Sequence, residues 1–409
     1  MRVAYDLAAM ESKGSGRRGI GRYTLELGKA IQAELLANGD EFLALDYAVD
    51  WEMLPEVRRC FGQSQLRHVH TPQPRGRHGA NEDALRPAGA ELVVDYYKTL
   101  DVDVIYVGSL FEGFETSLSL PVTYRGTGKL VVATFYDLTP LVFANKFLAN
   151  QDYRKWYYDC LERVRSCDLL LAISEATRQD AIKLLGIDEE HIVTIGGGID
   201  SRFRKLLNKT DEAILQRYGI QGKFVMDIGT VEWTKNFPRL IEGWSRLEPE
   251  LRQGRQLVLV CNNEHGQEGM VQEMACRYGL RPDDVLVTGY VPDDDLVELY
   301  NACELFVFPS LYEGLGFPPL EAMRCGAVVM GADNSSLTEV IGQKEALFNA
   351  ESSEHIATAI RRGLTDEGLR TRLREFGGKH SQKYTWQSAA CIAVEAIRKK
   401  LVKKRGMEQ

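Results

Sequence analysis

No apolar run in this sequence is as long as the roughly 18 residues that a membrane-spanning helix needs. No signal peptide is expected either, because Met1 is followed at once by Arg2-Val-Ala-Tyr, a pattern typical of a first strand. We therefore expect a cytoplasmic protein.

Net positive charge is also lacking. The chain has 50 Lys and Arg against 58 Asp and Glu, which gives a net charge of -8 at pH 7. Such a protein has no overall positive field to attract nucleic acid, so we expect no nucleic-acid partner and only a local anion site. The basic run 398–405 is the exception. It is typical of a solvated helix end, and peripheral contact with anionic lipid at the inner face of a membrane stays open as an alternative.

Cysteine pairs at metal-binding or redox spacing are missing. The eight cysteines are scattered without any C-x-x-C spacing and most lie in apolar segments, which is typical of free thiols in a reducing compartment. The stretch 67–78 is basic and rich in Pro and Gly, and it contains His68-x-His70 without a third ligand at a sensible spacing. We interpret this stretch as an exposed loop, with contact to an anionic acceptor as the functional alternative.

What the sequence contains instead is an alternation of short apolar runs, rich in Val, Ile and Phe, with segments of helical periodicity. This alternation predicts an α/β fold in which helices cover parallel sheets. One helix should carry Tyr23, Leu27 and Ile31 on one face. Another should begin after Ser174 and end at Gly186. The predicted strands are 2–7, 41–47, 103–107, 130–135, 168–173, 191–195, 224–229, 256–261, 284–288, 304–308 and 327–331.

The length of 409 residues predicts two or three domains, at roughly 100 to 200 residues per domain. The polar stretch 201–223 separates two series of alternating elements, so a domain boundary is placed there. We predict two doubly wound domains, 1–205 and 206–385, followed by a helical segment over 386–409.

The strongest motif is the stretch 308–326, FPSLYEGLGFPPLEAMRCG. A buried strand should end there, and a helix should open at about Pro318 after a glycine-rich turn. The backbone N–H groups of residues 314–317 and the positive helix end would then converge on one point, which suits a diphosphate. Glu313 and Glu321 bracket this turn. Either alone is commonly a solvated or helix-supporting residue, but the pair could bind different hydroxyl groups of one ligand.

Glu313 and Glu321, with seven residues between them, resemble the E-x7-E motif of the retaining glycosyltransferases of family four. The resemblance covers most of the chain except residues 48–100, through the stretches 19–24, 173–178, 289–293 and 384–386. It implies the GT-B fold, in which two Rossmann-like domains face across a cleft. It also implies that the first domain binds the acceptor, that the second binds a nucleotide sugar, and that the last helix crosses back onto the first domain.

By this resemblance, Glu313 would contact the donor sugar and Glu321 the ribose of the nucleotide. Lys235, in GTVEWTKN, would stabilise the diphosphate as the sugar leaves. A lone lysine is otherwise a solvated surface charge, so its place after a predicted strand supports this role. The other expected donor contacts are Gly314, Leu315, Gly316, Phe317, Thr230, Gly19, Arg17, Tyr290 and Val291.

Two positions depart from the family's pattern. Thr234 stands where many members have an arginine, so one phosphate contact would be lost or supplied by Arg17 or Arg18. Tyr136 stands before Asp137 where many members have a histidine, and a tyrosine can hydrogen-bond but cannot carry a positive charge. Both Tyr136 and Asp137 are candidate catalytic residues, with Asp137 expected on the acceptor side.

Two further motifs favour other chemistry only weakly. Residues 14–19 spell G-x-G-x-x-G, but six residues separate them from the first strand and no acidic residue follows about 20 positions later, as a dinucleotide site requires. Asp101-x-Asp103 and Asp293-Asp-Asp295 match the D-x-D motif of metal-dependent glycosyltransferases. The first opens a predicted strand and the second a predicted helix, and the GT-B resemblance implies no essential metal.

Together these features predict a metal-independent, retaining hexosyltransferase without a cofactor. It would move a hexose from a nucleotide-diphosphate sugar to a carbohydrate or lipid-linked acceptor. GDP-mannose is the preferred donor, because the start of the chain and the Glu313 motif resemble bacterial mannosyltransferases of polysaccharide assembly, and UDP-glucose stays open. The alternatives are a catalytically silent nucleotide-sugar binding protein, given Tyr136 and Thr234, and a dinucleotide-dependent oxidoreductase.

Overall fold

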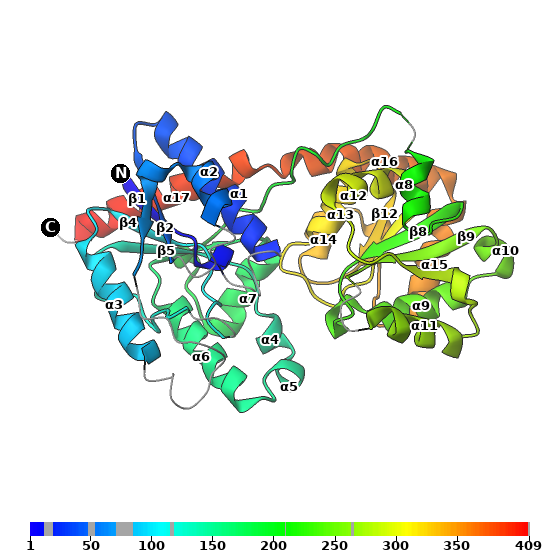
Figure 1. Cartoon of the computed structure of the whole chain (residues 1–409), viewed down its shortest axis with the longest axis horizontal. Helices are drawn as coiled ribbons and strands as arrows, with labels where there is room; N and C mark the ends of the chain where they lie inside the picture. The colour runs from blue at the N-terminus through cyan, green and yellow to red at the C-terminus, as the bar shows by residue number, and fades with distance from the viewer. Residues whose placement is uncertain are drawn as a thin grey trace. The chain divides into compact units, whose positions relative to one another are not determined.

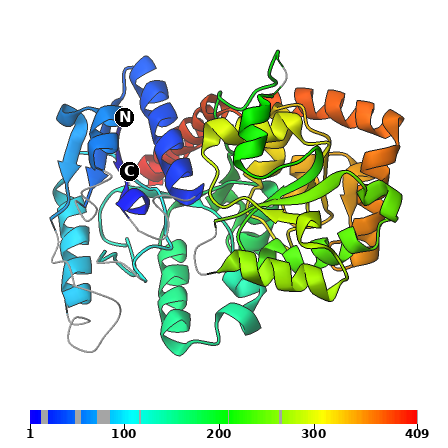
Figure 2. The same cartoon turned by 45° about the vertical axis from the view of Figure 1, so that its right-hand side comes forward.

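The computed structural model describes residues 1–11, 19–47, 54–70, 85–114, 118–208, 210–262 and 266–407. The chain divides into two compact units, Met1–Gly198 together with Thr385–Gln409, and Ile199–Tyr384. Each unit is one sheet with helices packed around it (Figure 1, Figure 2). The chain therefore leaves the first unit after Gly198 and returns to it at Thr385.

The sheet of the first unit has seven strands in the order β3-β2-β1-β4-β5-β6-β7, all paired in parallel. Every residue of β5 is buried, because helices cover both faces of such a sheet. The strand order reverses between β1 and β4. The strands are β1 Arg2–Asp6, β2 Glu41–Asp46, β3 Leu66–His68, β4 Val104–Val107, β5 Leu130–Phe135, β6 Leu169–Ala172 and β7 Ile192–Thr194.

The sheet of the second unit has six parallel strands in the order β10-β9-β8-β11-β12-β13. Its order reverses between β8 and β11, so the loops that follow these two strands diverge at the carboxyl edge of the sheet. This is the switch point at which doubly wound sheets bind ligands. The strands are β8 Lys223–Ile228, β9 Arg255–Val260, β10 Val285–Val287, β11 Leu305–Phe308, β12 Val329–Ala332 and β13 Leu347–Phe348.

The helices lie between the strands in the chain. Those of the first unit are α1 Gly19–Ala37, α2 Leu54–Phe61, α3 Leu85–Thr99, α4 Thr139–Val142, α5 Ala144–Phe147, α6 Gln151–Arg165, α7 Glu175–Leu185 and α17 Trp386–Met407. Those of the second unit are α8 Glu212–Arg217, α9 Phe237–Ser245, α10 Pro249–Arg252, α11 Gln267–Arg277, α12 Asp293–Ala302, α13 Phe317–Arg324, α14 Leu337–Ile341, α15 Ser353–Thr365 and α16 Glu367–His380. Within the described residues, no helix is long and apolar enough to cross a membrane.

The α/β architecture and all eleven predicted strands are confirmed. Two edge strands were not predicted, β3 and β13, because they are only three and two residues long and show no periodicity. The prediction of an exposed loop over 67–78 is wrong at its start, since Arg67 and His68 pair with β2. Residues 71–78 lie outside the described part of the chain.

The two predicted helices are also confirmed. Tyr23, Leu27 and Ile31 are buried on one face of α1. The Ser174 hydroxyl accepts a hydrogen bond from the Thr177 N–H at 3.0 Å and caps the start of α7. Gly186 ends that helix with a φ of 67°, a left-handed conformation that favours glycine.

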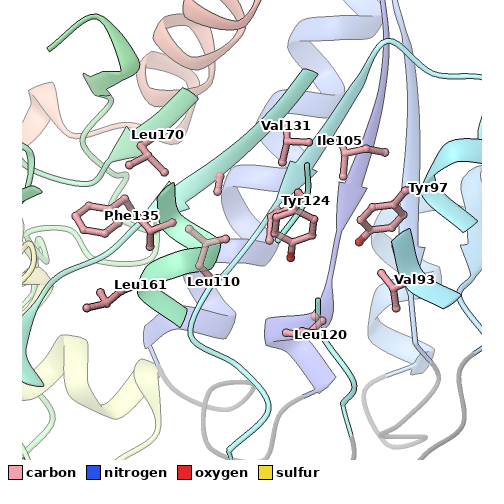
Figure 3. Close-up of a cluster of buried hydrophobic side chains, with 14 of the residues drawn as sticks. Val93, Tyr97, Ile105, Leu110, Leu120, Tyr124, Val131, Phe135, Leu161 and Leu170 are labelled. Carbon is pink, nitrogen blue, oxygen red and sulfur yellow. The ribbon is translucent and has the colours of Figure 1, made fainter. Parts of the chain in front are cut away.

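One face of the first sheet packs on α3, α6 and α7 through a continuous apolar cluster. Figure 3 shows part of this cluster, in which Tyr97 of α3 lies near Ile105 of β4 and Leu161 of α6 lies near Phe135 of β5. The segment that follows β4 contributes Leu110 to the same cluster. Its apolar side chains thus anchor this segment at the carboxyl edge of the sheet.

The final helix, α17, packs against α1 in the first unit. Its apolar side buries Ala390, Val394 and Ile397, and the Trp386 ring meets the Tyr23 ring edge-on at 5.0 Å between centroids. Because these contacts remove a whole apolar stripe from water, the helix is held to the first unit over several turns.

The basic end of α17 is engaged by acids that stand just before strands of the first sheet. This ties the helix to the amino edge of that sheet, so these cations are not the freely solvated helix end that the sequence suggested. The four ion pairs join Arg398 to Asp40, Lys403 to Glu190, Lys404 to Asp168 and Arg405 to Asp103.

The Arg398–Asp40 pair gives a test of this attachment. Burial alone would raise the pKa of Asp40, but hydrogen bonds from the N-terminal amine and Arg398 hold it below its usual value. Replacing Arg398 by Ala should lower the free energy of unfolding by about 1 kcal/mol at pH 7. An aspartate whose pKa is lower in the folded state stabilises the protein at pH values above its unfolded pKa, and this stabilisation is lost as the pH falls. The difference in unfolding free energy between wild type and Arg398→Ala should therefore shrink toward pH 3.

The matched control is Lys399→Ala, because Lys399 is exposed on the same helix and has no hydrogen bond or ion pair within the described residues. Denaturant unfolding measured at pH 7 and at low pH provides the comparison. Equal losses for Arg398→Ala and Lys399→Ala would show that the pair adds no stability.

Candidate functional site

The loop between β11 and α13 carries the predicted motif, and it is fastened to the loop that follows β8. The Leu311 N–H donates to the Thr234 carbonyl at 2.7 Å, and the Ser310 hydroxyl donates to the same oxygen at 3.1 Å. Thr234 itself is buried. Thr234, which stands where many family members have an arginine, therefore joins two loops at the switch point through its backbone carbonyl.

Asn236 fastens the same two loops from the other side. It adopts a left-handed conformation with φ at 61°, and its amide donates to the carbonyls of Pro309 and Ala350 at 3.0 and 2.8 Å. The strained backbone lets α9 begin directly after the turn that carries Lys235. Sequence reasoning assigned Asn236 no such role, because its partners lie far away in the chain.

The loop after β12 completes the frame. The Ser336 hydroxyl lies 2.9 and 2.8 Å from the carbonyl oxygens of Glu313 and Leu315, and the Ser335 hydroxyl accepts from the Glu313 N–H at 3.0 Å. Ser335 has a φ of 42°, which is unusual for a residue other than glycine. The backbone on both sides of the Glu313 side chain is thus held by hydrogen bonds.

Lys235 and Glu313 meet at this switch point. The Lys235 ammonium lies 2.6 Å from a Glu313 carboxylate oxygen, and the two side chains are 24% and 14% exposed. Burial alone would lower the pKa of Lys235, but the Glu313 carboxylate outweighs it, so the pKa lies above its usual value. Lys235 is therefore a fixed positive charge at neutral pH.

Gly229 makes room for the Lys235 side chain. A Cβ atom at Gly229 would lie 3.2 Å from Cγ of Lys235, closer than side chains normally approach. The lysine stem therefore lies against the backbone at the end of β8 and presents its ammonium beside Glu313.

Asp227 lies beneath this pair and was not predicted. It is buried in β8, and among the described residues its carboxylate accepts one hydrogen bond, from the Ile228 N–H at 2.8 Å. Burial raises its pKa well above the usual value, against the opposing effects of that bond and of the Lys235 charge. Asp227 is the one charged residue in the run 224–228, and an acid inside an otherwise apolar strand is the sequence signal that could have found it.

The equivalent strand of the first unit ends differently. Asp6, near the carboxyl end of β1, is also buried, but it accepts hydrogen bonds from the hydroxyls of Tyr47 and Tyr97 at 2.7 and 2.6 Å and from the Ala8 N–H at 2.7 Å. Three donors satisfy that carboxylate within the fold. The second unit instead places a cation beside its buried aspartate.

Glu321, the second predicted glutamate, is 7% exposed in α13. It accepts a long hydrogen bond of 3.3 Å from the hydroxyl of Tyr300, whose ring packs edge-on against Phe203 at 6.0 Å. Glu321 is thus a buried carboxylate one helical turn behind the Glu313 loop. That position suits a hydroxyl ligand better than a solvent-facing role.

The glycine-rich turn has the expected course. Gly316 is the N-cap of α13 with a φ of 95°, and a Cβ atom there would lie 2.8 Å from Leu337. Gly314 and Leu315 are buried, whereas Phe317 is partly exposed. The turn therefore ends the loop that holds Glu313 and aims the start of α13 at the same edge of the sheet.

The remaining predicted donor contacts follow other strands of the second unit. The Thr230 hydroxyl is buried and has no hydrogen-bond partner among the described residues. Tyr290 is 73% exposed just after β10, while Val291 is buried beside it. All three stand at carboxyl ends of strands, on the edge where Lys235 lies.

The predicted residues of the first unit lie at the carboxyl end of β5. The Tyr136 hydroxyl lies 3.1 Å from the Thr24 hydroxyl and 3.1 Å from the Gly108 carbonyl, so it points into the fold. Burial raises its pKa well above the usual value, and it stays a neutral phenol. Asp137 is partly buried and accepts from the Thr139 N–H at 2.8 Å. Tyr136 thereby holds the backbone from which Asp137 projects.

The other sequence motifs lie mostly outside the described residues or form ion pairs of their own. Arg17 and Arg18 lie outside the described residues, as does most of the G-x-G-x-x-G stretch, and Gly19 begins α1. Asp293 and Asp295 form ion pairs with Arg202 and Arg217. In the described part of the chain, no three His, Cys, Asp or Glu side chains gather as a metal site would require.

Comparison with known families matches the two units separately. Residues 17–203 match the model described as Glycosyltransferase Family 4, and residues 211–380 match the one described as Glycosyl transferases group 1. The second match spans Lys235, Glu313 and Glu321.

Two similar curated proteins come from Escherichia coli. The serotype-specific mannosyltransferase WbdA is 30% identical over 97% of this chain and 48% of its own length, so the chain spans about half of that relative. The O-antigen chain mannosyltransferase B is 28% identical over 93% of this chain and 96% of its own length.

Solved structures show the fold. Anabaena HepE, in complex with UDP and glucose, superposes with a TM-score of 0.72 at 18% identity, over 98% of this chain and 100% of its own. WaaG, a glycosyltransferase of lipopolysaccharide biosynthesis, superposes with a TM-score of 0.65 at 17% identity, over 96% and 98% of the two chains. The fold of this chain is GT-B.

The buried Asp227 gives a prediction about pH. Its folded-state pKa is raised, so the wild-type protein loses stability as pH rises from the unfolded pKa toward the folded one. Asp227→Asn removes this loss. The variant should therefore gain melting temperature relative to wild type between pH 5 and pH 8, by a few degrees.

Thermal unfolding of both proteins at the two pH values is the measurement. A variant that instead loses more stability at pH 8 than at pH 5 would show that Asp227 is ionised and acts as a counter-charge to Lys235.

Proposed function

Because this chain belongs to the glycosyltransferases that join a family 4 domain to a group 1 domain on the GT-B fold, we propose that it transfers a hexose from a nucleotide-diphosphate sugar to a carbohydrate or lipid-linked acceptor. We propose that the transfer retains the anomeric configuration and needs neither metal nor cofactor. The Lys235–Glu313 pair at the switch point of the second sheet is the observation on which this proposal rests.

The chemistry of the second unit supports a diphosphate ligand. Lys235 carries a positive charge held in place by Glu313, and the N-terminal end of α13 faces the same edge of the sheet. Lys235 can donate to a phosphate oxygen while it remains close to Glu313, because an ammonium has three donors. The buried surroundings strengthen this interaction relative to water.

In the proposed reaction, the acceptor oxygen forms a bond to the anomeric carbon on the face from which the phosphate leaves. The bond between that carbon and the phosphate oxygen breaks, and the acceptor's proton passes to the leaving phosphate. Lys235 and the amides of residues 314–317 stabilise the charge that develops on the phosphate. Glu313 contacts the transferred sugar, and Glu321 binds the ribose hydroxyls.

Mannose is the hexose that we propose, with GDP-mannose as donor. The support is the similarity to two E. coli proteins named as mannosyltransferases, of which one extends well beyond the length of this chain. HepE, a structural neighbour at low sequence identity, is bound to UDP and glucose, so UDP-glucose is the donor to compare.

On the acceptor side we propose Asp137. Its side chain stands at the carboxyl end of β5, and Tyr136 fixes the backbone from within the fold. Tyr136 is then a positioning residue.

A silent nucleotide-sugar binding protein stays the second candidate function. Nucleotide release upon addition of acceptor would distinguish an active transferase from such a binding protein. Neither family match supports a dinucleotide-dependent oxidoreductase.

The two glutamates should differ in kinetics. A carboxylate at Glu313 interacts more strongly with the positive charge of the transition state than with the bound donor, so Glu313→Gln should lower kcat on the order of a hundredfold. Glu321→Gln removes binding that is uniform through the reaction, so it should raise the donor KM about tenfold with a smaller change in kcat. Steady-state kinetics with calorimetric donor affinities is the measurement.

Glu250→Gln serves as the control, because Glu250 is an exposed residue of α10. All assays contain excess EDTA, and the proposal expects activity to persist there. Loss of activity in EDTA with recovery in manganese would contradict metal independence. If Glu313→Gln abolishes donor binding while Glu321→Gln binds donor but stops turnover, the two roles are reversed.

A further inference from the structure

A pocket of about 480 Å³ opens in the first unit, outside the residues considered so far. It lies between the start of α3, one face of α6 from Asp152 to Arg163, and the segment that follows β4. Its volume falls within the roughly 300–1,000 Å³ of small-molecule sites. All its lining residues belong to one unit, so its shape does not depend on the placement of the other.

One wall of the pocket is aromatic. Trp156 of α6 lines it, and the indole N–H donates to the Glu112 carbonyl at 3.4 Å. The rings of Phe114 and Tyr153 flank Trp156, with centroids 5.2 Å away in each case. These contacts fix the ring in place, so it offers a rigid apolar surface at the pocket.

The same face of α6 also carries charged side chains that are partly open to a ligand. Asp152, Lys155 and Asp159 of α6 line the pocket, and none of them has a hydrogen bond or ion pair within the described residues. Arg163 lines the buried end of the pocket. That guanidinium is buried and donates to the carbonyl of Pro121 at 2.6 Å and to the carbonyl of Leu110.

The aromatic ring and the charged side chains together determine which kind of ligand the pocket can bind. Carboxylates and cations alternate around the pocket, so a strongly anionic or cationic molecule meets like charges as well as opposite ones. Sugar hydroxyls both donate and accept, and can satisfy carboxylates and a lysine together. The C–H face of a pyranose ring is apolar and can lie on the indole.

From these contacts we infer that the pocket between α3 and α6 binds a neutral oligosaccharide, and that it holds the part of an acceptor glycan behind the sugar that receives the hexose. The assignment of this glycan as the acceptor rests on the proposed function. The binding of an oligosaccharide in the pocket does not depend on it. The pocket would favour acceptors that are already several sugars long.

The position of the pocket fits this role. The charge of Asp137 reaches Tyr153, whose pKa is raised to about 12 by burial first and then by Cys160 and Asp137. Tyr153 in turn contacts Trp156. Asp137 and the start of α6 also both belong to the connection that leaves the carboxyl end of β5, so the candidate acceptor residue and the aromatic ring lie on one stretch of the first unit.

The test is the equilibrium binding of α-linked mannotriose to the full chain, measured by NMR or calorimetry in the absence of any nucleotide sugar. Wild type should bind it, and Trp156→Ala should weaken binding roughly tenfold or more. Asp159→Asn, a nearly isosteric change at a partly exposed position, should weaken binding several-fold without affecting folding. Tyr158→Ala is the matched control, because Tyr158 is 50% exposed on the same helix and does not line the pocket.

GDP-mannose affinity, measured beside it, should not change in any of these variants. Wild type that fails to bind mannotriose, or Trp156→Ala and Asp159→Asn variants that bind it as wild type does, would overturn the inference. Tighter binding of mannose 6-phosphate than of mannotriose would also overturn it, by indicating an anion site. Failure of GDP-mannose to bind, with mannotriose still bound, would count against the proposed function alone.

Discussion

The ion pair between Lys235 and Glu313 joins two loops at the point where the strand order of the second sheet reverses. Its geometry depends on the frame around it, since Asn236 and Ser336 hold the neighbouring backbone by side-chain hydrogen bonds. Such a frame is costly to build, because it contains two non-glycine residues with positive φ. Under the proposed function, this frame would hold the charge pair ready to stabilise the charge that develops on the leaving phosphate.

The two sheets use the same position in opposite ways. In the first, Asp6 is satisfied by two tyrosines and a backbone N–H, which closes the end of β1 as structure. In the second, Asp227 has one backbone donor among the described residues and the Lys235 charge nearby, so fewer hydrogen bonds satisfy the carboxylate at the end of β8. The basic end of α17 is paired at the amino edge of the first sheet, opposite the carboxyl edge where Asp137 stands.

The fold could be predicted from the sequence because its signals are local. Apolar runs mark the strands, and Ser174 and Gly186 cap a helix through contacts within five residues. The positions of Lys235 and Glu313 after strands were predictable for the same reason. The hydrogen bonds of Asn236 and the pocket beside Trp156 were not, because each depends on residues brought together only by the fold. Edge strands of two or three residues carry too little pattern to be seen.

A crystal structure of the protein with GDP-mannose, grown in EDTA, tests the central claim most directly. The account predicts a diphosphate within hydrogen-bonding distance of the Lys235 ammonium. It also predicts that the Glu313 carboxylate contacts the sugar hydroxyls while it stays beside the Lys235 ammonium, 2.6 Å away in the present structure, and that Glu321 lies against the ribose. A donor bound elsewhere, with the Lys235–Glu313 pair intact and the diphosphate remote from it, would contradict the account.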